Sequence, residues 1–255
     1  MSREIKRKKS QIADIESKLI AIVRESDGIS RLSLSKALKL AASTIGVYVE
    51  RLISEGFLLE AKKEKDLRSG RPEVLLKLNP NRGEFIGVDF YAEHIMAKSV
   101  NFANQAVQEK IVRMSSQDTA GAVLKKLIEA INSVYSQEKE VLGIGLSIPG
   151  SIDLVEGTLF KYKWLPNLQN LKLGQAVRDH FDVPVYFENT ANLMALGEMK
   201  FGAHKNLQNF VCVTIRSGIG CGVVINGSVV AGENNHCGEI EYWKCPGAGK
   251  GSTLP

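Results

Sequence analysis

Residues 185–198 read VYFENTANLMALGE, and polar side chains gather where an apolar strand gives way to a helical pattern. Asn189 and Thr190 can each donate and accept hydrogen bonds. Threonine has no pKa near neutrality, so Thr190 cannot act as a general base. The sequence does not fix where the Glu188 carboxylate points. The turn is therefore suited to hydrogen bonding rather than to proton transfer, and for Asn189 the alternative role is a helix cap.

Two glycine-rich segments raise the question of phosphate binding. Residues 209–232 read as a hairpin around a glycine-rich bend. The segment GAGKGS near the C-terminus fails as a phosphate loop, because the residue after Lys250 is glycine and no glycine stands at position 244. We expect this second segment to form only a turn.

The composition is that of an ordinary globular protein. The chain has 255 residues, of which 44% are hydrophobic and 24% are charged, and this length suffices for two domains. No apolar run approaches the roughly 18 residues that span a bilayer. The basic N-terminus has no apolar core behind it, so it is not a signal peptide. We therefore expect a cytoplasmic chain with no membrane partner, whose cysteines form no CxxC pair and remain free thiols.

The charge is unevenly distributed along the chain. Residues 1–80 contain 17 Lys and Arg against 11 Asp and Glu, a net charge of +6, whereas residues 81–255 carry a net charge of −1. This asymmetry indicates a module that faces nucleic acid, attached to a neutral domain. The alternative is a basic face that only keeps the chain in solution.

Residues 1–80 show the pattern of three helices and a hairpin. Apolar residues at helical spacing predict a first helix, Ser30 can cap a short second helix, and Gly56 stops a third. Two strands follow, at residues 57–59 and 74–78, on either side of a polar, basic segment. This order of elements is the layout of a winged helix.

The third helix exposes small polar, apolar and cationic side chains, which suit base edges and phosphates in a DNA major groove. At the hairpin tip, glycine allows a close backbone approach and arginine suits a narrow minor groove. The alternative is a three-helix scaffold that binds another protein. The predicted DNA-binding residues are Ser43, Thr44, Val47, Tyr48, Arg51, Arg68 and Arg71.

From Phe85 onward, strands and helices alternate. Three consecutive strands come first, followed by a long amphipathic helix over residues 120–137. The expected strands are residues 85–90, 94–102, 106–114, 141–150 and 183–189, followed by the hairpin described above. Periodicity alone supports only an α/β class.

Several motifs occur in an order that resembles the ROK family of sugar-responsive repressors and sugar kinases. IGLSIPGSIDLVEGTL is similar to the family's Gly-Pro-Gly turn, and YFENTANLMALGE to its Glu-Asn-Asp-Ala-Asn motif. RSGIGCGVVINGSVVAG is similar to its phosphate loop, and HCGEIEY to its His-x-Gly-Glu-x-Gly-His motif.

The resemblance implies a winged helix-turn-helix at residues 1–80 and an actin-like, sugar kinase-like (ribonuclease H-like) α/β domain at residues 81–255. Family members continue past the position of Pro255, so we expect the second lobe to be incomplete. A fragment, a natural truncation and a partner that supplies the missing layer all remain open.

A kinase of this family needs a first glycine loop for ATP phosphates, an aspartate base and a second phosphate loop. The first loop reads Asp89-Phe90-Tyr91-Ala92-Glu93, where aromatic bulk and a carboxylate replace glycines that would let backbone N–H groups approach an anion. The second loop keeps its glycines but begins Arg216-Ser217, and Thr190 stands in the place of the base. The resemblance therefore implies no catalytic residue here.

Sugar binding can survive the loss of chemistry. The resemblance places a sugar effector in the cleft between the lobes, held by Asn189, Thr190, His236 and Glu239. The alternative for His236 and Glu239 is a surface position. The family's zinc cluster is not matched, because only Cys245 remains of its cysteines, so we expect no metal and no cofactor.

The sequence predicts a transcriptional regulator that represses carbohydrate-utilisation genes. It is expected to bind double-stranded operator DNA as a homodimer and to sense a sugar without phosphorylating it. The alternatives are a degenerate ROK sugar kinase and a truncated DNA-binding protein that no longer senses an effector. The sequence does not identify the sugar.

Overall fold

The computed structural model describes residues 2–62, 74–203, 205, 207–216, 218–232 and 237–240, with the side chains of residues 2–12 left aside. The chain divides into two compact units. Unit 1 comprises Met1–Glu84 with Val100–Gln105 and Glu138–Glu140. Unit 2 comprises Phe85–Ser99, Ala106–Gln137 and Val141–Pro255. Among the described residues, no helix is both long and apolar enough to cross a membrane.

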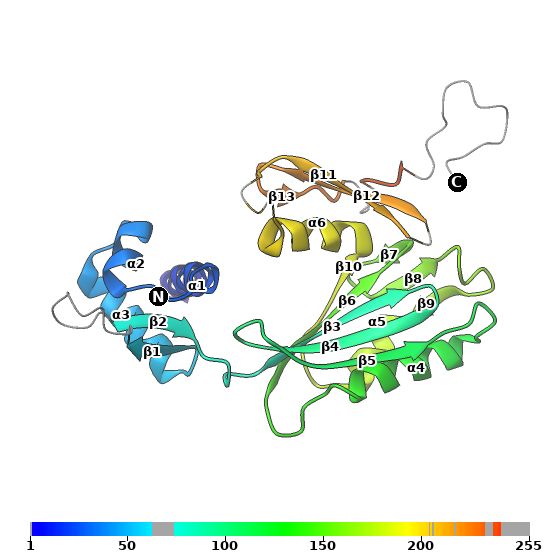
Figure 1. Cartoon of the computed structure of the whole chain (residues 1–255), viewed down its shortest axis with the longest axis horizontal. Helices are drawn as coiled ribbons and strands as arrows, with labels where there is room; N and C mark the ends of the chain where they lie inside the picture. Colours follow the sequence, from blue (N-terminus) through cyan, green and yellow to red (C-terminus); the bar gives the residue numbers. More distant parts are fainter. Residues whose placement is uncertain are drawn as a thin grey trace. The chain divides into compact units, whose positions relative to one another are not determined.

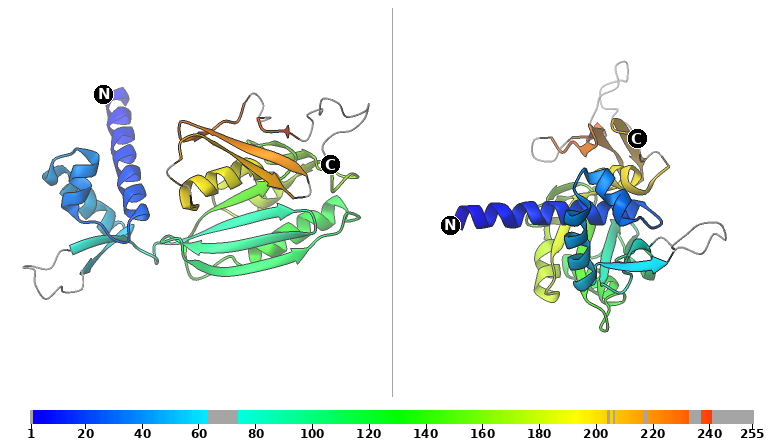
Figure 2. Two further views of the ribbon diagram at one scale, coloured as in Figure 1. Left: turned by 45° about the horizontal axis from the view of Figure 1, so that its top comes forward. Right: turned by 90° about the vertical axis from the view of Figure 1, so that its left-hand side faces the viewer.

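Unit 1 begins with three helices, α1 (Ser2–Glu25), α2 (Arg31–Leu38) and α3 (Ala42–Ser54). Figure 2 shows α1 as a long helix beside the shorter α2 and α3. Strands β1 (Leu58–Lys62) and β2 (Val74–Leu78) then form an antiparallel pair, so the predicted strand at residues 57–59 begins one residue later than expected. The three helices and the hairpin share a core of buried aliphatic side chains, among them Leu19, Val23, Leu34, Ile45, Val49, Leu52, Leu58 and Leu76.

Local capping explains where these short helices begin and end. The Ser30 hydroxyl accepts a hydrogen bond from the Ser33 backbone N–H, at 3.3 Å, and so satisfies one free donor at the start of α2, as predicted. After α3, Gly56 adopts a φ of +78°, a conformation that glycine reaches without strain. Ser30 thus marks the start of α2, and Gly56 marks the break between α3 and β1.

Unit 2 is built on a five-stranded sheet of order β10-β6-β3-β4-β5 (Figure 1). Its strands are β3 (Glu84–Tyr91), β4 (His94–Asn101), β5 (Ala106–Arg113), β6 (Val141–Ile148) and β10 (Val185–Asn189), and β10 pairs with β6 in parallel. Alternate residues of β3 and β4 are buried, as expected for strands with one face on a core. The sequence therefore predicted the strands of this sheet closely.

Helices cover both faces of this sheet. Helix α4 (Ala120–Asn132) ends five residues before the predicted position, and with α5 (Leu173–His180) it covers one face. Helix α6 (Thr190–Phe201) lies on the other face, between the sheet and a smaller one (Figure 1). The main core contains residues of β3, β6 and α4 together, among them Phe90, Ile144, Leu146, Leu127 and Ile131.

Two smaller antiparallel sheets complete unit 2. One contains β7 (Ser151–Asp153), β8 (Thr158–Lys161) and β9 (Gln169–Lys172). The other contains β11 (Phe210–Ile215), β12 (Ile219–Ile225) and β13 (Ser228–Val229), which pack on α6 through Ala195, Met199 and Val224. The predicted hairpin is thus the pair β11–β12.

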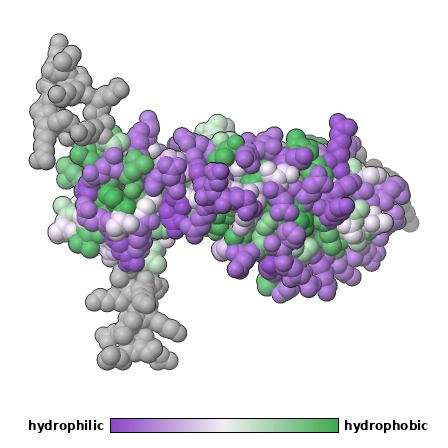
Figure 3. All heavy atoms as spheres, turned by 90° about the horizontal axis from the view of Figure 1, so that it is seen from below, coloured by the Kyte–Doolittle hydropathy of each residue, from purple (hydrophilic) through white to green (hydrophobic). Residues whose placement is uncertain are grey.

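The surface of the molecule is mixed in character. The side drawn in Figure 3 is mostly hydrophilic, with hydrophobic side chains in small groups between, as is usual for a face in water. On β11, in contrast, alternate residues leave one face apolar and exposed, because Val211, Val213 and Ile215 are 56%, 54% and 77% exposed.

Candidate functional site

The turn between β10 and α6 holds its polar side chains in fixed roles. The Asn189 side-chain oxygen accepts a hydrogen bond from the Ala191 N–H at 2.8 Å and caps α6. Its side-chain nitrogen donates to the Gly150 carbonyl at 3.4 Å. The helix-cap alternative for Asn189 is therefore confirmed, and the same side chain ties α6 to the loop after β6.

Thr190 in this turn is buried, with 8% of its surface exposed. The hydroxyl of Ser147, on the neighbouring strand β6, donates to the Thr190 hydroxyl oxygen at 3.0 Å. Glu188 is also held locally, since one of its carboxylate oxygens accepts hydrogen bonds from the Asn189 N–H at 2.8 Å and the Asn192 amide at 3.2 Å. The turn thus presents hydroxyl and amide groups, and one oxygen of its carboxylate accepts hydrogen bonds from within the turn itself.

A groove of about 810 Å³ opens beside this turn. Its floor is the face of the large sheet that α6 partly covers. Gly87 and Gly145 lie on this floor without side chains, and a Cβ on either would point into open space, with no atom within 4 Å. Helix α6 supplies the side wall with Leu193 and Leu196. A mostly apolar groove with a few polar groups at one end has the character of a small-molecule site.

An arginine closes one end of the groove. The two terminal nitrogens of Arg216, just after β11, donate to the two carboxylate oxygens of Asp89 at 2.8 and 3.3 Å. The guanidinium also lies over the Tyr91 ring, with its carbon 3.9 Å from the ring centroid. The hydrogen bonds to Asp89 raise the pKa of Arg216 above its usual value. Bidentate pairing and ring stacking are the geometry in which arginine binds most firmly.

No sequence pattern predicted this pair. Asp89 opens the altered first loop and Arg216 opens the altered second loop, but they lie 127 residues apart and no local pattern joins them. The signal that could have found them is complementary charge, a carboxylate in one altered loop and a guanidinium in the other.

The glycines of β12 have a packing role. A Cβ on Gly222 would lie 2.5 Å from both the Ala191 carbonyl oxygen and the Ala195 Cβ, so only glycine lets β12 approach α6 this closely. Gly220 is less tight, with its nearest contact at 3.3 Å. The glycine-rich pattern that resembles a phosphate loop thus also reflects contact between a strand and a helix.

Glu239 lies near the start of β12, whereas His236 is outside the described residues. The Cys221 N–H donates to the Gly238 carbonyl at 2.9 Å, which brings the residue before Glu239 to β12. The preceding strand residue, Gly220, lies against Ala191 in the first turn of α6. Strand β12 therefore lies between Glu239 and the first turn of α6, and Glu239 is partly buried.

The cysteines show no metal centre in the described part of the chain. Cys212, Cys221 and Cys237 are free thiols, and Cys245 is outside the described residues. Burial raises the pKa of the Cys221 thiol, and neighbouring Cys237 and Glu239 act in the same direction. No group of three or more potential ligands gathers among the residues that the structure describes.

Helix α3 presents most of the residues predicted to contact DNA. Ser43 is exposed, Val47 is 70% exposed, and Thr44 and Tyr48 are half-buried. Arg51 is exposed but not free, because it pairs with Glu55 at 2.8 Å and with Glu16 at 3.3 Å. Arg68 and Arg71 lie outside the described residues.

Comparison with known proteins agrees with the fold and the motifs. The model of the ROK family matches residues 85–245. A xylose repressor from Caldicellulosiruptor bescii is 31% identical over 220 residues, which cover 84% of this chain and 54% of the relative. The chain thus spans about half the length of the curated relatives it matches.

Two solved structures share the fold. One is a ROK family transcriptional regulator homologous to the Escherichia coli MLC protein, with a TM-score of 0.68 and 24% identity over 87% of this chain and 57% of that one. The other is a ROK family glucokinase from Streptomyces griseus, solved with glucose and AMPPNP. It gives a TM-score of 0.57 and 25% identity over 64% of this chain and 51% of that one. The ROK family model matches most of unit 2, and unit 2 has the sugar-kinase-like fold. The chain therefore belongs to the ROK family.

Proposed function

We propose that this chain acts in a sugar-responsive, DNA-binding transcriptional repressor that does not phosphorylate its sugar. The observation that carries the proposal is Thr190, a buried threonine bonded to Ser147 at the turn where a sugar kinase needs a carboxylate base. A hydroxyl there binds hydroxyls but takes no proton. The name of the Caldicellulosiruptor bescii relative, a xylose repressor, supports the same function.

The Arg216–Asp89 pair supports the absence of kinase chemistry. ATP phosphates need exposed N–H groups or cations that have no internal partner. Here the cation at the end of the groove already binds Asp89 through both terminal nitrogens. An incoming phosphate would have to displace a bidentate carboxylate.

The DNA-binding part of the proposal assigns a winged helix-turn-helix to residues 1–80 and the ROK domain to residues 81–255. Helix α3 would enter the major groove with Ser43, Thr44, Val47 and Tyr48. Arg51 would have to exchange its carboxylate partners for phosphates, and Arg68 and Arg71 would contact DNA from the wing. We propose a homodimer on a two-fold symmetric operator, as is usual for such motifs.

The sugar-binding part assigns the effector to the groove beside α6. Asn189, Thr190, His236 and Glu239 would hold its hydroxyl groups. D-Xylose is the first sugar to test, because the relative is named for it. Isothermal calorimetry with a sugar panel, on wild type and Thr190→Val, tests this assignment, since the valine keeps the shape but removes the hydroxyl.

Fluorescence anisotropy with labelled DNA from the region upstream of the gene tests the DNA-binding function. We expect salt-sensitive, sequence-selective binding that Val47→Asp abolishes, because a carboxylate on the exposed face of α3 would repel phosphates. Lys110→Ala, an exposed cation of β5 in unit 2, is the matched control. Equal affinity for unrelated DNA would contradict the proposal.

The alternative function is a degenerate sugar kinase, favoured by the glucokinase among the structures that share the fold. Incubation with ATP and each sugar, followed by detection of sugar phosphate, separates the two. Sugar phosphate formed in amounts above the enzyme concentration would overturn the proposed function.

A further inference from the structure

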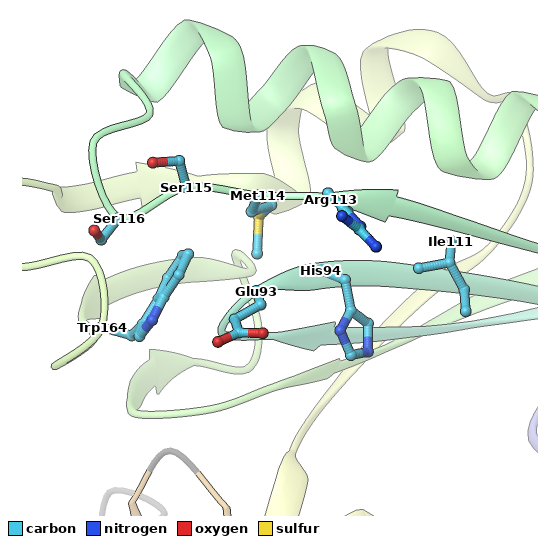
Figure 4. A pocket seen from close by; sticks show the side chains of 8 residues that line it. All are labelled: Glu93, His94, Ile111, Arg113, Met114, Ser115, Ser116 and Trp164. Carbon is cyan, nitrogen blue, oxygen red and sulfur yellow. The ribbon is translucent and has the colours of Figure 1, made fainter.

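A second cavity of unit 2 lies outside the groove and the β10–α6 turn. It has a volume of about 770 Å³, within the range of small-molecule sites. It opens over the β3–β4 turn, the end of β5 and the loop that follows β8 (Figure 4). Its lining is Glu93, His94, Ile111, Arg113, Met114, Ser115, Ser116 and Trp164.

Opposite charges line this cavity without binding each other. Glu93 and Arg113 are both exposed, and among the residues that the structure describes neither forms a side-chain hydrogen bond or an ion pair. Their backbones are neighbours, because the N–H of Met114, the residue after Arg113, donates to the Glu93 carbonyl at 2.7 Å. The Glu93 carboxylate and the Arg113 guanidinium are thus both available to a ligand.

An aromatic face and hydroxyl groups complete the cavity. Trp164 is partly buried and packs on the core of unit 2, which fixes its indole. In Figure 4 the indole lies at one end of the cavity, and the Glu93 carboxylate points toward it. Asp118 accepts a hydrogen bond from the Ser115 N–H at 2.8 Å and so fixes the loop that supplies Ser115 and Ser116.

The mixture of charges selects the chemistry of the ligand. Glu93 would repel an anion and Arg113 would repel a cation, so a ligand without net charge fits best. A neutral ligand that uses a carboxylate, a guanidinium and two hydroxyls must carry both donors and acceptors, and vicinal hydroxyls provide them. The negative face of an indole attracts the weakly positive C–H groups of a pyranose ring.

We infer that this cavity is a second carbohydrate site, which binds a neutral pyranose between Trp164, Glu93 and Arg113. It is separate from the groove, and it stands whether or not the groove binds the effector. The site is open to solvent on one side, so a sugar at the end of a longer saccharide would fit as well as a free one.

Tryptophan fluorescence offers a direct test, because the chain has only two tryptophans. In Trp243→Phe, all indole emission comes from Trp164. Titration with D-xylose and with D-glucose should change this emission with a saturable curve for at least one of them. Arg113→Ala and Glu93→Gln should each weaken binding about tenfold, since the first removes a charged donor and the second replaces a charged acceptor by a neutral amide. Lys110→Ala, on the opposite face of the same strand, should leave it unchanged.

Thr190→Val separates this site from the groove, and saturation-transfer NMR on the wild-type chain checks the result without Trp243→Phe. The inference holds if the Trp164 signal survives Thr190→Val and weakens with Arg113→Ala. It is overturned if no sugar changes the emission or the NMR signal. It is also overturned if binding depends on Thr190 and not on Arg113, or if glutamine, a zwitterion, binds where the sugars do not.

Discussion

Two carboxylates on the same hairpin of unit 2 differ in whether a cation binds them. Asp89 lies near the end of β3 and is bound by both terminal nitrogens of Arg216. Glu93, four residues on, shares a cavity with Arg113 but forms no ion pair among the described residues. Tyr91 lies between them, with Arg216 over its ring and His94 against its edge. Charges that bind each other hold a structure together, whereas charges held apart are available to a ligand.

The largest effect on stability is expected at the close contact between β12 and α6. Gly222→Ala would place a methyl group 2.5 Å from the Ala191 carbonyl oxygen, so β12 must move away from α6. We expect a loss of about 3 kcal/mol in the free energy of unfolding, measured by urea denaturation. Gly145→Ala is the matched control, because its Cβ would meet nothing within 4 Å. Equal stability of the two variants would contradict the packing role of Gly222.

Removal of the bound arginine should have the next largest effect. Arg216→Ala leaves Asp89, whose side chain is only 20% exposed, without its cation. We expect a loss of about 2 kcal/mol, between the values for exposed and fully buried pairs. A double-mutant cycle with Asp89→Asn should show a coupling of at least about 1 kcal/mol. Purely additive effects would mean that the pair contributes little.

An intermediate case is Asp118, which fixes the serine loop of the second cavity. A hydrogen bond from Lys126, at 2.5 Å, and one from the Ser115 N–H hold the pKa of Asp118 below its usual value. Its contribution is therefore present above the unfolded-state pKa of 3.8 and is lost as pH falls through the lower folded value. Thermal melts of wild type and Asp118→Asn should differ by at most about 1 kcal/mol at pH 7 and converge in acid. A difference that persists at low pH would contradict this.

The smallest effect on stability is expected at Arg113. Because this side chain binds no described residue, Arg113→Ala should change the free energy of unfolding by less than about 0.5 kcal/mol. The same variant should weaken sugar binding at the second cavity. A large loss of stability on thermal denaturation would show that Arg113 has a structural partner and would remove the contrast with Arg216.

Sequence patterns predicted the large sheet and the short helices of residues 1–80 well because those patterns are local, whereas β7, β8 and β9 were not predicted. The cap at Ser30, the strand at Val74–Leu78 and the alternation in β3 all depend on neighbours a few residues away. The end of α4 was misplaced by five residues, since the helical pattern continues past the point where the chain turns.

The candidate site was predicted less completely. The motif resemblance identified Asn189 and Thr190, but it could not show that Asn189 caps α6 or that Thr190 bonds to Ser147. Those contacts, like the Arg216–Asp89 pair, join segments that only the folded sheet brings together. The glycines of β12 match a phosphate-loop pattern in the sequence, but in the structure they also allow β12 to pack on α6. Only the contact with Ala191 shows this packing role.

The central claim is that one chain couples sugar binding to DNA binding. The most direct measurement is the dissociation constant for upstream DNA, by anisotropy at fixed salt, with and without saturating sugar. We predict that one sugar of the panel, D-xylose first, weakens binding by about 5- to 150-fold, the range of typical coupling between sites. The same dissociation constant with every sugar would contradict the account.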